Sequence, residues 1–155
     1  MTYPYHNIKK IKVQILRLSN AKDLPLPKYM TSYASGADIF AAIKEELTIE
    51  PGEIKLIPTG FCVAIPKGYE IQIRPRSGLA IKHGITIVNA PGTIDADYRG
   101  EIKVGLINLG SKSFTIKRGD RIAQMVLSPC PRIYWEEVIK LPETQRAEGG
   151  FGHTG

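Results

Sequence analysis

The chain is organised around the stretch Gly92-Thr-Ile-Asp-Ala-Asp-Tyr-Arg-Gly-Glu101, which lies between two segments with the pattern of β-strands. Upstream, the β-branched run at 85–89 leads into a Pro-Gly turn. Downstream, Ile102, Val104 and Leu106 recur with a period of two, which places alternate side chains on one face of a sheet. The stretch is therefore predicted to be a polar connection between strands.

Asp95 is the candidate catalytic group of this connection. A carboxylate that strands hold from both sides is positioned without being buried, as a proton acceptor for a bound water must be. The neighbouring Asp97 and Arg99 are typical of a solvated turn, and that interpretation explains Asp95 equally well. The stretch alone leaves both interpretations open, because a short motif needs structural context.

Proline and glycine turns divide most of the remaining chain into short β-branched segments. Their spacing of roughly eight to twelve residues predicts an all-β sandwich or barrel. A first strand is expected at Ile11, Val13 and Ile15. The other predicted inward-facing residues are Ile54, Leu56, Cys62, Ala64, Tyr69, Ile71, Ile73, Phe114, Ile116, Ile122, Gln124, Val126, Ile133 and Trp135. One short helix is expected over residues 78–82, with Ser77 as its N-cap and His83-Gly84 as its end.

The composition indicates one domain in 155 residues, of which 43% are hydrophobic. The sequence has no apolar run long enough to span a membrane and no signal-like start, so a cytoplasmic protein without membrane contacts is expected. Cys62 and Cys130 lie too far apart to suggest a zinc site or a disulfide framework, and both are expected to pack in strands.

The formal net charge of +6 favours anionic partners. Lysines and arginines are nevertheless spread along the chain, and the only basic doublets are Lys9-Lys10 and Lys117-Arg118. This pattern is typical of a mildly basic, solvated surface and does not predict binding of nucleic acid.

Four glycines fall within the last seven residues of the chain, around Phe151. Glycine-rich termini are usually mobile because they bury little surface. A tail that becomes ordered over a ligand, with Phe151 stacked on an aromatic ring, would explain the combination as well. The stretch lacks the lysine and the following helix of a phosphate-binding P-loop.

Five stretches together closely resemble the ordered motifs of the trimeric dUTPases, over nearly the whole chain. These are residues 34–42, 75–80, 89–101, 119–124 and 146–155. The resemblance implies a β-jelly-roll-like subunit with one short helix, in a homotrimer whose active sites are each assembled from all three chains. It also implies Mg²⁺ as cofactor and conversion of dUTP to dUMP and pyrophosphate, which limits uracil in DNA and supplies dUMP for dTMP synthesis.

The resemblance also implies roles for residues on the central stretch. Asp95 would be the general base that deprotonates the attacking water, and Tyr98 would lie under the deoxyribose and exclude a 2′-hydroxyl. Asn89 would read the uracil edge together with the main chain of the turn that it opens, at Gly92, Thr93 and Ile94. From the residues alone, Tyr98 is better explained as a strand aromatic packed in the core, and Asn89 could be a residue that merely opens a turn.

Phosphate contacts are implied for a second set of residues, Arg76, Ser77, Gly78 and Gln124. Asp38 would lie near Mg²⁺ and contact it through water. As a domain division, residues 1–141 would form the β domain. Residues 142–155 would form a flexible arm that closes over an active site, with Arg146 on the γ-phosphate, Phe151 stacked on the uracil and Gly152 as a further substrate-binding residue.

Two departures from the family pattern concern this arm. Ala147 stands where the family usually has glycine, and His153 stands where serine is common.

Two other functions remain to be distinguished. A dCTP deaminase has a related fold and would release ammonia, but the motif at 75–79 and the arm favour the hydrolase. A basic β-barrel that binds single-stranded nucleic acid would need aromatic and basic residues interleaved on one face. Only 8% of the residues are aromatic. A salt-dependent gel shift would test this remote possibility.

Overall fold

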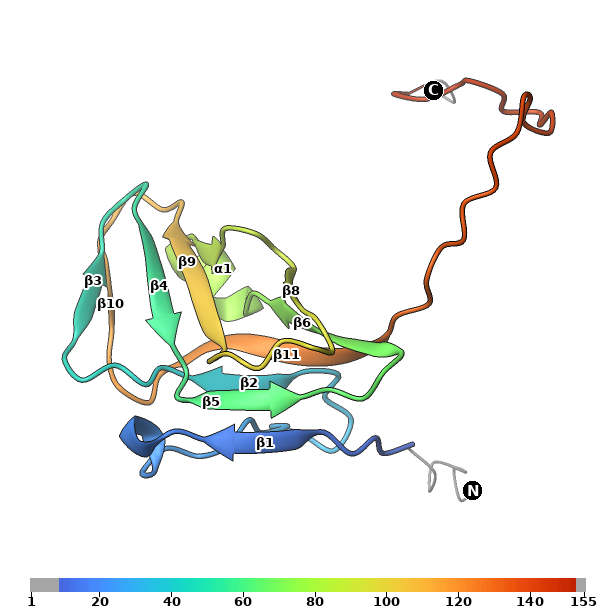
Figure 1. Ribbon diagram of the computed structural model, residues 1–155. Helices are drawn as coiled ribbons and strands as arrows, with labels where there is room; N and C mark the ends of the chain where they lie inside the picture. The colour runs from blue at the N-terminus through green and yellow to red at the C-terminus, as the bar shows by residue number, and fades with distance from the viewer. Residues whose placement is uncertain (1–8, 153–155) are drawn as a thin grey trace, which may run out of the picture.

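Short antiparallel strands make up most of the regular secondary structure in the computed structural model, which describes residues 9–152 (Figure 1). In chain order they are β1 (Gln14–Arg17), β2 (Ala37–Phe40), β3 (Leu47–Ile49), β4 (Ile54–Pro58), β5 (Phe61–Ala64), β6 (Tyr69–Arg74), β7 (Ile85–Ile87), β8 (Gly92–Ile94), β9 (Lys103–Asn108), β10 (Phe114–Ile116) and β11 (Arg121–Pro129). A 3-10 turn, η1 (Ser19–Ala21), follows β1, and one α-helix, α1 (Ser77–His83), follows β6.

The strands form a four-stranded sheet, β2-β11-β6-β8, a three-stranded sheet, β4-β9-β7, and the pairs β1-β5 and β10-β3. Most hydrogen-bonded neighbours are far apart in sequence, so the chain crosses repeatedly between the sheets. The long strand β11 lies between β2 and β6 and holds the larger sheet together. This arrangement confirms the predicted all-β, jelly-roll-like class with one short helix.

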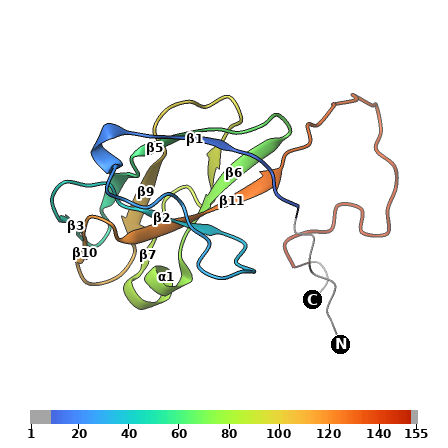
Figure 2. The same cartoon turned by 90° about the horizontal axis from the view of Figure 1, so that it is seen from below.

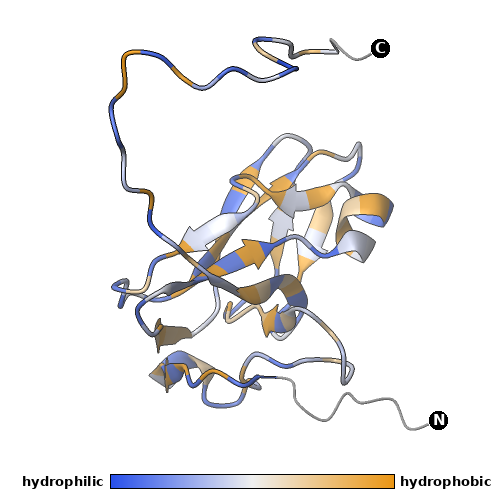
Figure 3. Ribbon diagram, turned by 90° about the vertical axis from the view of Figure 1, so that its right-hand side faces the viewer, coloured by the Kyte–Doolittle hydropathy of each residue, from blue (hydrophilic) through white to orange (hydrophobic). Residues whose placement is uncertain are grey.

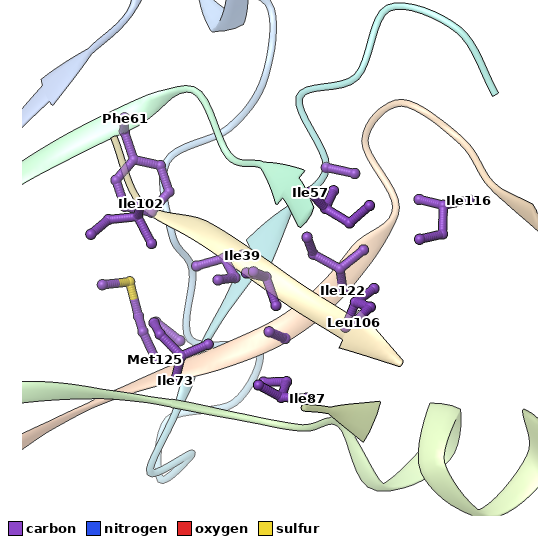
Figure 4. Packing of buried hydrophobic residues seen from close by; sticks show 14 of the residues in the cluster. Ile39, Ile57, Phe61, Ile73, Ile87, Ile102, Leu106, Ile116, Ile122 and Met125 are labelled. Carbon is purple, nitrogen blue, oxygen red and sulfur yellow. The ribbon is translucent and has the colours of Figure 1, made fainter. Parts of the chain in front are cut away.

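Isoleucines dominate the core, which fills the space between the two larger sheets (Figure 4). Ile39 of β2 and Ile57 of β4 are fully buried there, together with Leu106 of β9. The predicted inward positions Ile71, Ile73, Ile116 and Ile122 are buried as expected. The alternation of Ile102, Val104 and Leu106 is likewise confirmed, since all three are buried.

The prediction of the inward face was wrong for β4 and β5. Leu56 is 63% exposed and Ile54 is exposed as well, whereas Ile57 is buried opposite Val104 of β9. In β5 the buried residues are Phe61 and Val63 instead of the predicted Cys62 and Ala64. Both faces of these strands carry apolar residues, so the period of two could not decide between them, and a shift by one residue inverts every side chain.

The predictions for the two ends of the β domain also need correction. β1 begins at Gln14, after Ile11 and Val13. Ile133 and Trp135 are exposed on an extended segment that follows β11 and forms no strand. Cys130 is exposed directly after β11, whereas Cys62 lies half-buried in β5. An alternating apolar pattern forms a strand only where another strand pairs with it, and the described chain provides no such partner for 131–138.

The helix α1 occupies the predicted place beside β7, on the side of the domain away from β1 (Figure 2). Ser77 is its first residue and not its cap, because the N-cap is Arg76, without a capping side-chain hydrogen bond. Gly84 ends the helix at φ 70°, and its N–H donates to the carbonyls of Ala80 and Leu79. A Cβ on Gly84 would lie 2.3 Å from the backbone nitrogen of Gly110, so this position requires glycine for space as well as for conformation.

Asn108 is a fully buried polar residue whose hydrogen bonds are all made within the protein. Its Nδ2 donates to the carbonyls of Ile49 and Lys112, at 2.8 Å each. Its Oδ1 accepts from the N–H of Gly110 at 2.9 Å. One amide thus joins the end of β9 to β3 and to the loop that leads into β10.

We expect Asn108→Ala to lower the free energy of unfolding by about 3 kcal/mol, because it leaves buried carbonyls without a donor. Urea denaturation at one protein concentration measures this change. Thr48→Ala is a matched control, since it removes only the exposed hydroxyl pair between Thr48 and Thr115. A stability of Asn108→Ala close to that of the control would contradict this role.

Candidate active site

An open pocket of about 490 Å³ lies against the loop that follows β8. Four predicted site residues line it, namely Thr93, Ile94, Asp95 and Tyr98. Leu56 of β4, with Glu101 and Lys103 at the start of β9, completes the lining. The stretch at 92–101 therefore provides most of the lining of this cavity, and β4 and β9 contribute the rest.

A tight turn fixes the relative positions of Asp95 and Tyr98. The N–H of Tyr98 donates to the carbonyl of Asp95 at 3.1 Å. Arg99 reinforces the turn, because its Nη1 donates to the carbonyls of Ala96 at 2.7 Å and Tyr98 at 2.9 Å. The Asp95 side chain is exposed, so its carboxylate can contact a water molecule while the backbone beneath it stays in place.

The ring of Tyr98 folds back over Gly100. A Cβ on Gly100 would meet the Tyr98 hydroxyl oxygen and the ring carbons next to it, so any other residue there would displace the ring from this position. The hydroxyl donates to the carbonyl of Glu101 at 3.1 Å. With 44% of its surface exposed, Tyr98 is a pocket residue and not part of the core.

Asn89 and Gly92 lie at the opposite end of β8 from Asp95. The Ala90–Pro91 peptide bond between them is cis. Gly92 is buried, and a Cβ there would lie 3.3 Å from Cβ of Ile73 and 3.5 Å from Nδ2 of Asn89. The Asn89 amide is thus held close to the first residue of β8, where backbone groups are also available.

A second group of predicted residues lies on the four-stranded sheet. Asp38 of β2 pairs with Gln124 of β11, which pairs in turn with Arg74 of β6. Only 5% of Asp38 is exposed, and its Oδ2 accepts from Nη1 of Arg121 at 3.1 Å. Nε of Arg76 lies 3.6 Å from the same oxygen. The buried negative charge is therefore balanced by two guanidinium groups.

Arg76 and Gln124 are held by their neighbours. Nη1 of Arg76 donates to the carbonyl of Arg121 at 3.0 Å. Gln124 lies over Gly36, where a Cβ would be 2.7 Å from its Oε1. Ser77 and Gly78 follow Arg76 as exposed residues in the first turn of α1. Arginine, amide and hydroxyl groups thus gather at one end of this sheet, in a combination suited to phosphate oxygens.

The two groups of residues lie apart within one chain. Asp95 follows Ile94, which pairs with Ile71, whereas Gln124 pairs with Arg74 further along β6. Three residues of strand correspond to about 10 Å. A nucleotide bound at Asp95 and Tyr98 of one chain would therefore not reach that chain's Arg76 and Gln124 without extending along the sheet.

The predicted arm residues are also separate from the pocket. Residues 130–152 run away from the β domain as an extended segment (Figure 1). Arg146 donates from Nε to the carbonyl of Gly149 at 2.7 Å, and Phe151 is fully exposed. Ala147 has φ 45°, Phe151 φ 49° and Gly152 φ 92°, so two side-chain-bearing residues adopt a conformation that favours glycine. His153 lies outside the described residues.

Hydrophobic and hydrophilic stretches follow one another along this segment (Figure 3), and its large apolar side chains are exposed. They are Ile133, Tyr134, Trp135, Val138, Ile139 and Leu141. Exposed apolar residues in such a density usually mark a surface that contacts another protein.

The described part of the chain contains no group of three or more His, Cys, Asp or Glu residues that could hold a metal ion. Asp38 is the buried carboxylate nearest to the phosphate-type cluster, and both of its arginine contacts use Oδ2. Mg²⁺ commonly keeps several waters and binds one or two carboxylates together with substrate phosphates. The residues present therefore fit a cation that is bound mainly by ligand phosphates, since the second carboxylate oxygen of Asp38 makes neither of these arginine contacts. None of the helices in residues 9–152 has the length and apolar character of a membrane span.

Four residues that lie at these sites were not predicted from the sequence, namely Arg121, Glu101, Lys103 and Leu56. Arg121 lies three residues before Gln124, and a bulge between Arg121 and Ala123 pairs it with Phe40, two residues along β2 from Asp38 and on the same face. Leu56 was expected in the core. For Glu101 and Lys103, the one sign of a site role in the sequence was their charge, at the start of the strand that follows the loop of Asp95.

An all-β fold that presents an exposed carboxylate and tyrosine in one pocket, and arginines with a glutamine on a nearby sheet, fits a class of β-proteins that act on phosphate-bearing ligands. The dUTPase family model matches residues 22–155, and the chain belongs to this family. The fold class and family expected from the five motifs are both confirmed.

Named relatives agree with this assignment. The chain is 60% identical over 147 residues to the deoxyuridine 5'-triphosphate nucleotidohydrolase of Desulfotalea psychrophila, covering 95% of this chain and 98% of the relative. It is 57% identical over 145 residues to the enzyme of the same name from Caldanaerobacter subterraneus subsp. tengcongensis, covering 94% and 98%.

Solved structures of phage enzymes share the fold. The Staphylococcus bacteriophage 80alpha dUTPase with dUpNHpp has a TM-score of 0.80 and 29% identity, over 94% of this chain and 99% of that one. A mutant dUTPase from phage phi11 of S. aureus, described with a structural Mg(II) ion, has a TM-score of 0.73 and 26% identity, over 84% and 98%.

Proposed function

We propose that this chain hydrolyses dUTP to dUMP and pyrophosphate, with Asp95 as the base that activates water. The observation that carries the proposal is the pocket in which Asp95 and Tyr98 lie side by side on one hydrogen-bonded turn. Membership of the dUTPase family, with relatives named as deoxyuridine 5'-triphosphate nucleotidohydrolases, indicates the substrate.

The reaction is an in-line attack of water on the α-phosphorus. Asp95 accepts a proton from the water as the new P–O bond forms, and the pyrophosphate leaves on the opposite side. A positioned general base contributes roughly 10²–10⁴-fold to such a step. Tyr98 lies under the deoxyribose, where its ring leaves no room for a 2′-hydroxyl.

The uracil and the phosphates are bound by different elements of the fold. Asn89 and the main chain at Gly92, Thr93 and Ile94 read the uracil edge. Hydrogen-bonding sites of this kind reject an analogue whose edge leaves buried groups unpaired. Arg76 and Gln124, with Ser77 and Gly78, bind phosphate oxygens, because a guanidinium fork and neutral donors match them.

We assign Mg²⁺ to the substrate phosphates, with water-mediated contact from Asp38. When bound, it neutralises charge on the triphosphate. In its absence, the two guanidinium groups on Asp38 keep that carboxylate compensated, and Arg76 retains a contact to the carbonyl of Arg121.

We propose further that the protein is a homotrimer whose active sites are shared between chains. Two features support the sharing of sites. The pocket at Asp95 and the cluster at Arg76 lie apart in one chain, by the register of β6. The exposed apolar side chains of residues 133–141 also need another surface to cover them. Neighbouring chains would supply Arg76 and Gln124 to the pocket.

The arm at 142–155 then closes over a site, with Arg146 on the γ-phosphate, Phe151 stacked on the uracil and Gly152 as a further substrate-binding residue. Phe151 is available for stacking, since its ring makes no contact that buries it in the single chain. Hydrolysis of dUTP would limit uracil in DNA and provide dUMP for dTMP synthesis. We place the enzyme in the cytoplasm, where its two free thiols, one of them exposed, suit a reducing compartment.

Incubation with dUTP or dCTP in the presence of Mg²⁺ tests the reaction. We expect pyrophosphate and dUMP from dUTP, and neither pyrophosphate nor ammonia from dCTP. Ammonia from dCTP would instead establish the related deaminase, which is not favoured by the named relatives. A gel shift with single-stranded oligonucleotides should show no binding at moderate salt.

A further inference from the structure

Glu101 is anchored to the turn between β4 and β5 by a hydrogen bond that its side chain accepts. The carboxylate oxygen Oε1 accepts from the N–H of Gly60 at 2.9 Å, in a half-buried position. The next residue is anchored too, because the N–H of Ile102 donates to the carbonyl of Phe61 at 2.9 Å. The carbonyl of Ile102 accepts from the Thr59 hydroxyl at 2.6 Å. The turn at 59–61 therefore clamps residues 101 and 102 from outside the site.

Glu101 also holds Tyr98, through its main chain. The carbonyl oxygen of Glu101 accepts from the Tyr98 hydroxyl at 3.1 Å, across the glycine at position 100. A continuous path of hydrogen bonds thus runs from the backbone of Gly60, through Glu101, to the tip of the Tyr98 ring. Tyr98 itself is 44% exposed, so packing alone does not fix its ring.

We propose that Glu101 is a positioning residue for sugar specificity, which holds the Tyr98 ring where it excludes a ribonucleotide. The inference rests on the proposed function, in which Tyr98 lies under the deoxyribose. Steric exclusion of one hydroxyl group requires a ring that cannot swing aside, and an exposed tyrosine gains that rigidity from a fixed acceptor.

The hydrogen bond to Gly60, and not the charge of Glu101, accounts for this role. The ion pair between Glu101 Oε2 and Lys103 Nζ spans 3.9 Å, and the lysine side chain is 47% exposed. Pairs of this kind contribute little. The bond from a backbone N–H to Oε1 is shorter, and glutamine offers an oxygen at the same place.

Steady-state kinetics with dUTP and UTP test the proposal, through the ratio of their kcat/KM values. We expect Glu101→Ala to lower the ratio of dUTP to UTP by about tenfold, mainly through faster UTP hydrolysis. Glu101→Gln should keep the ratio within about twofold of wild type, because it retains the acceptor oxygen. Glu53→Ala is the matched control, since Glu53 also holds a turn, through Oε2 and the N–H of Glu50, away from the pocket.

A double-mutant cycle with Tyr98→Phe separates positioning from loss of stability. Tyr98→Phe keeps the ring and removes the hydroxyl, so it should lower the ratio by a similar factor. Adding Glu101→Ala to Tyr98→Phe should then change the ratio by less than about twofold, because the two act through one path. A thermal melt of each variant shows whether it is folded.

Three results would overturn the proposal: a wild-type ratio in Glu101→Ala, equal losses in Glu101→Gln and Glu101→Ala, or additive effects in the cycle. These three results differ from the result expected if the proposed function were wrong. If it were wrong, the wild-type protein itself would not hydrolyse dUTP, whatever the variants do.

Discussion

Replacing Asp95 with asparagine is expected to lower kcat for dUTP by at least about 10²–10⁴-fold, while the affinity for the nucleotide stays nearly unchanged. Asparagine keeps the size and the hydrogen-bonding reach of the side chain but cannot accept the proton of the attacking water. The turn itself should persist, since the bond that closes it uses the backbone carbonyl of Asp95. The loss would therefore appear in the chemical step and not in binding.

Two measurements check this expectation. Pyrophosphate release gives kcat, and calorimetric titration with the non-hydrolysable analogue dUpNHpp gives the affinity. Asp97→Asn is the matched control, because Asp97 is an exposed carboxylate two residues further along the same loop, outside the pocket lining. Turnover by Asp95→Asn close to that of this control would remove Asp95 from the role of base.

The fold class could be predicted from the sequence because its determinants are local. Proline and glycine turns recur between β-branched runs, and the glycines at positions 52, 60, 68 and 119 all have positive φ. A positive φ depends mainly on the residue at that one position, because glycine adopts it without strain. The end of α1 at Gly84 was predictable for the same reason.

The inward faces were less predictable because they depend on pairing partners. Leu56 and Ile57 are both large and apolar, and only the pairing of β4 with β9 decides that Ile57 enters the core. The pattern at Ile133 and Trp135 indicates a strand, yet these residues stand exposed on the single chain. A strand that needs a neighbour from another chain would leave the same pattern in the sequence.

The residues of the candidate site show the same difference between what is local in the sequence and what depends on distant partners. Asp95 and Tyr98 are three residues apart, so a single turn brings them into one pocket, as the motif indicates. The contact of Arg121 with Asp38 joins residues 83 positions apart. The bond between Gly60 and Glu101 joins residues 41 positions apart. Neither contact has a local signature, and both became visible only in the folded chain.

Deleting residues 146–155 is expected to leave a folded protein of unchanged oligomeric mass with little activity. The hydrogen bonds at the start of this segment stay local: Arg146 bonds Gly149, and Ala147 bonds Thr144. Stability and assembly should therefore not depend on it. Activity should fall by about 10³-fold or more, which is the usual contribution of an arginine that stabilises charge on a transferring phosphoryl group.

Light scattering, a thermal melt and pyrophosphate release measure these three properties on one sample. Phe151→Ala separates the two functions of the arm, because it removes the stacking group and keeps Arg146. Since a ring that covers the base acts mainly in binding, this variant should raise KM more than it lowers kcat. Lys140→Ala removes only an exposed pair with Glu143 and should behave as wild type. Full activity in the shortened protein would show that the arm takes no part in the reaction, whereas a loss of oligomeric mass would place its role in assembly.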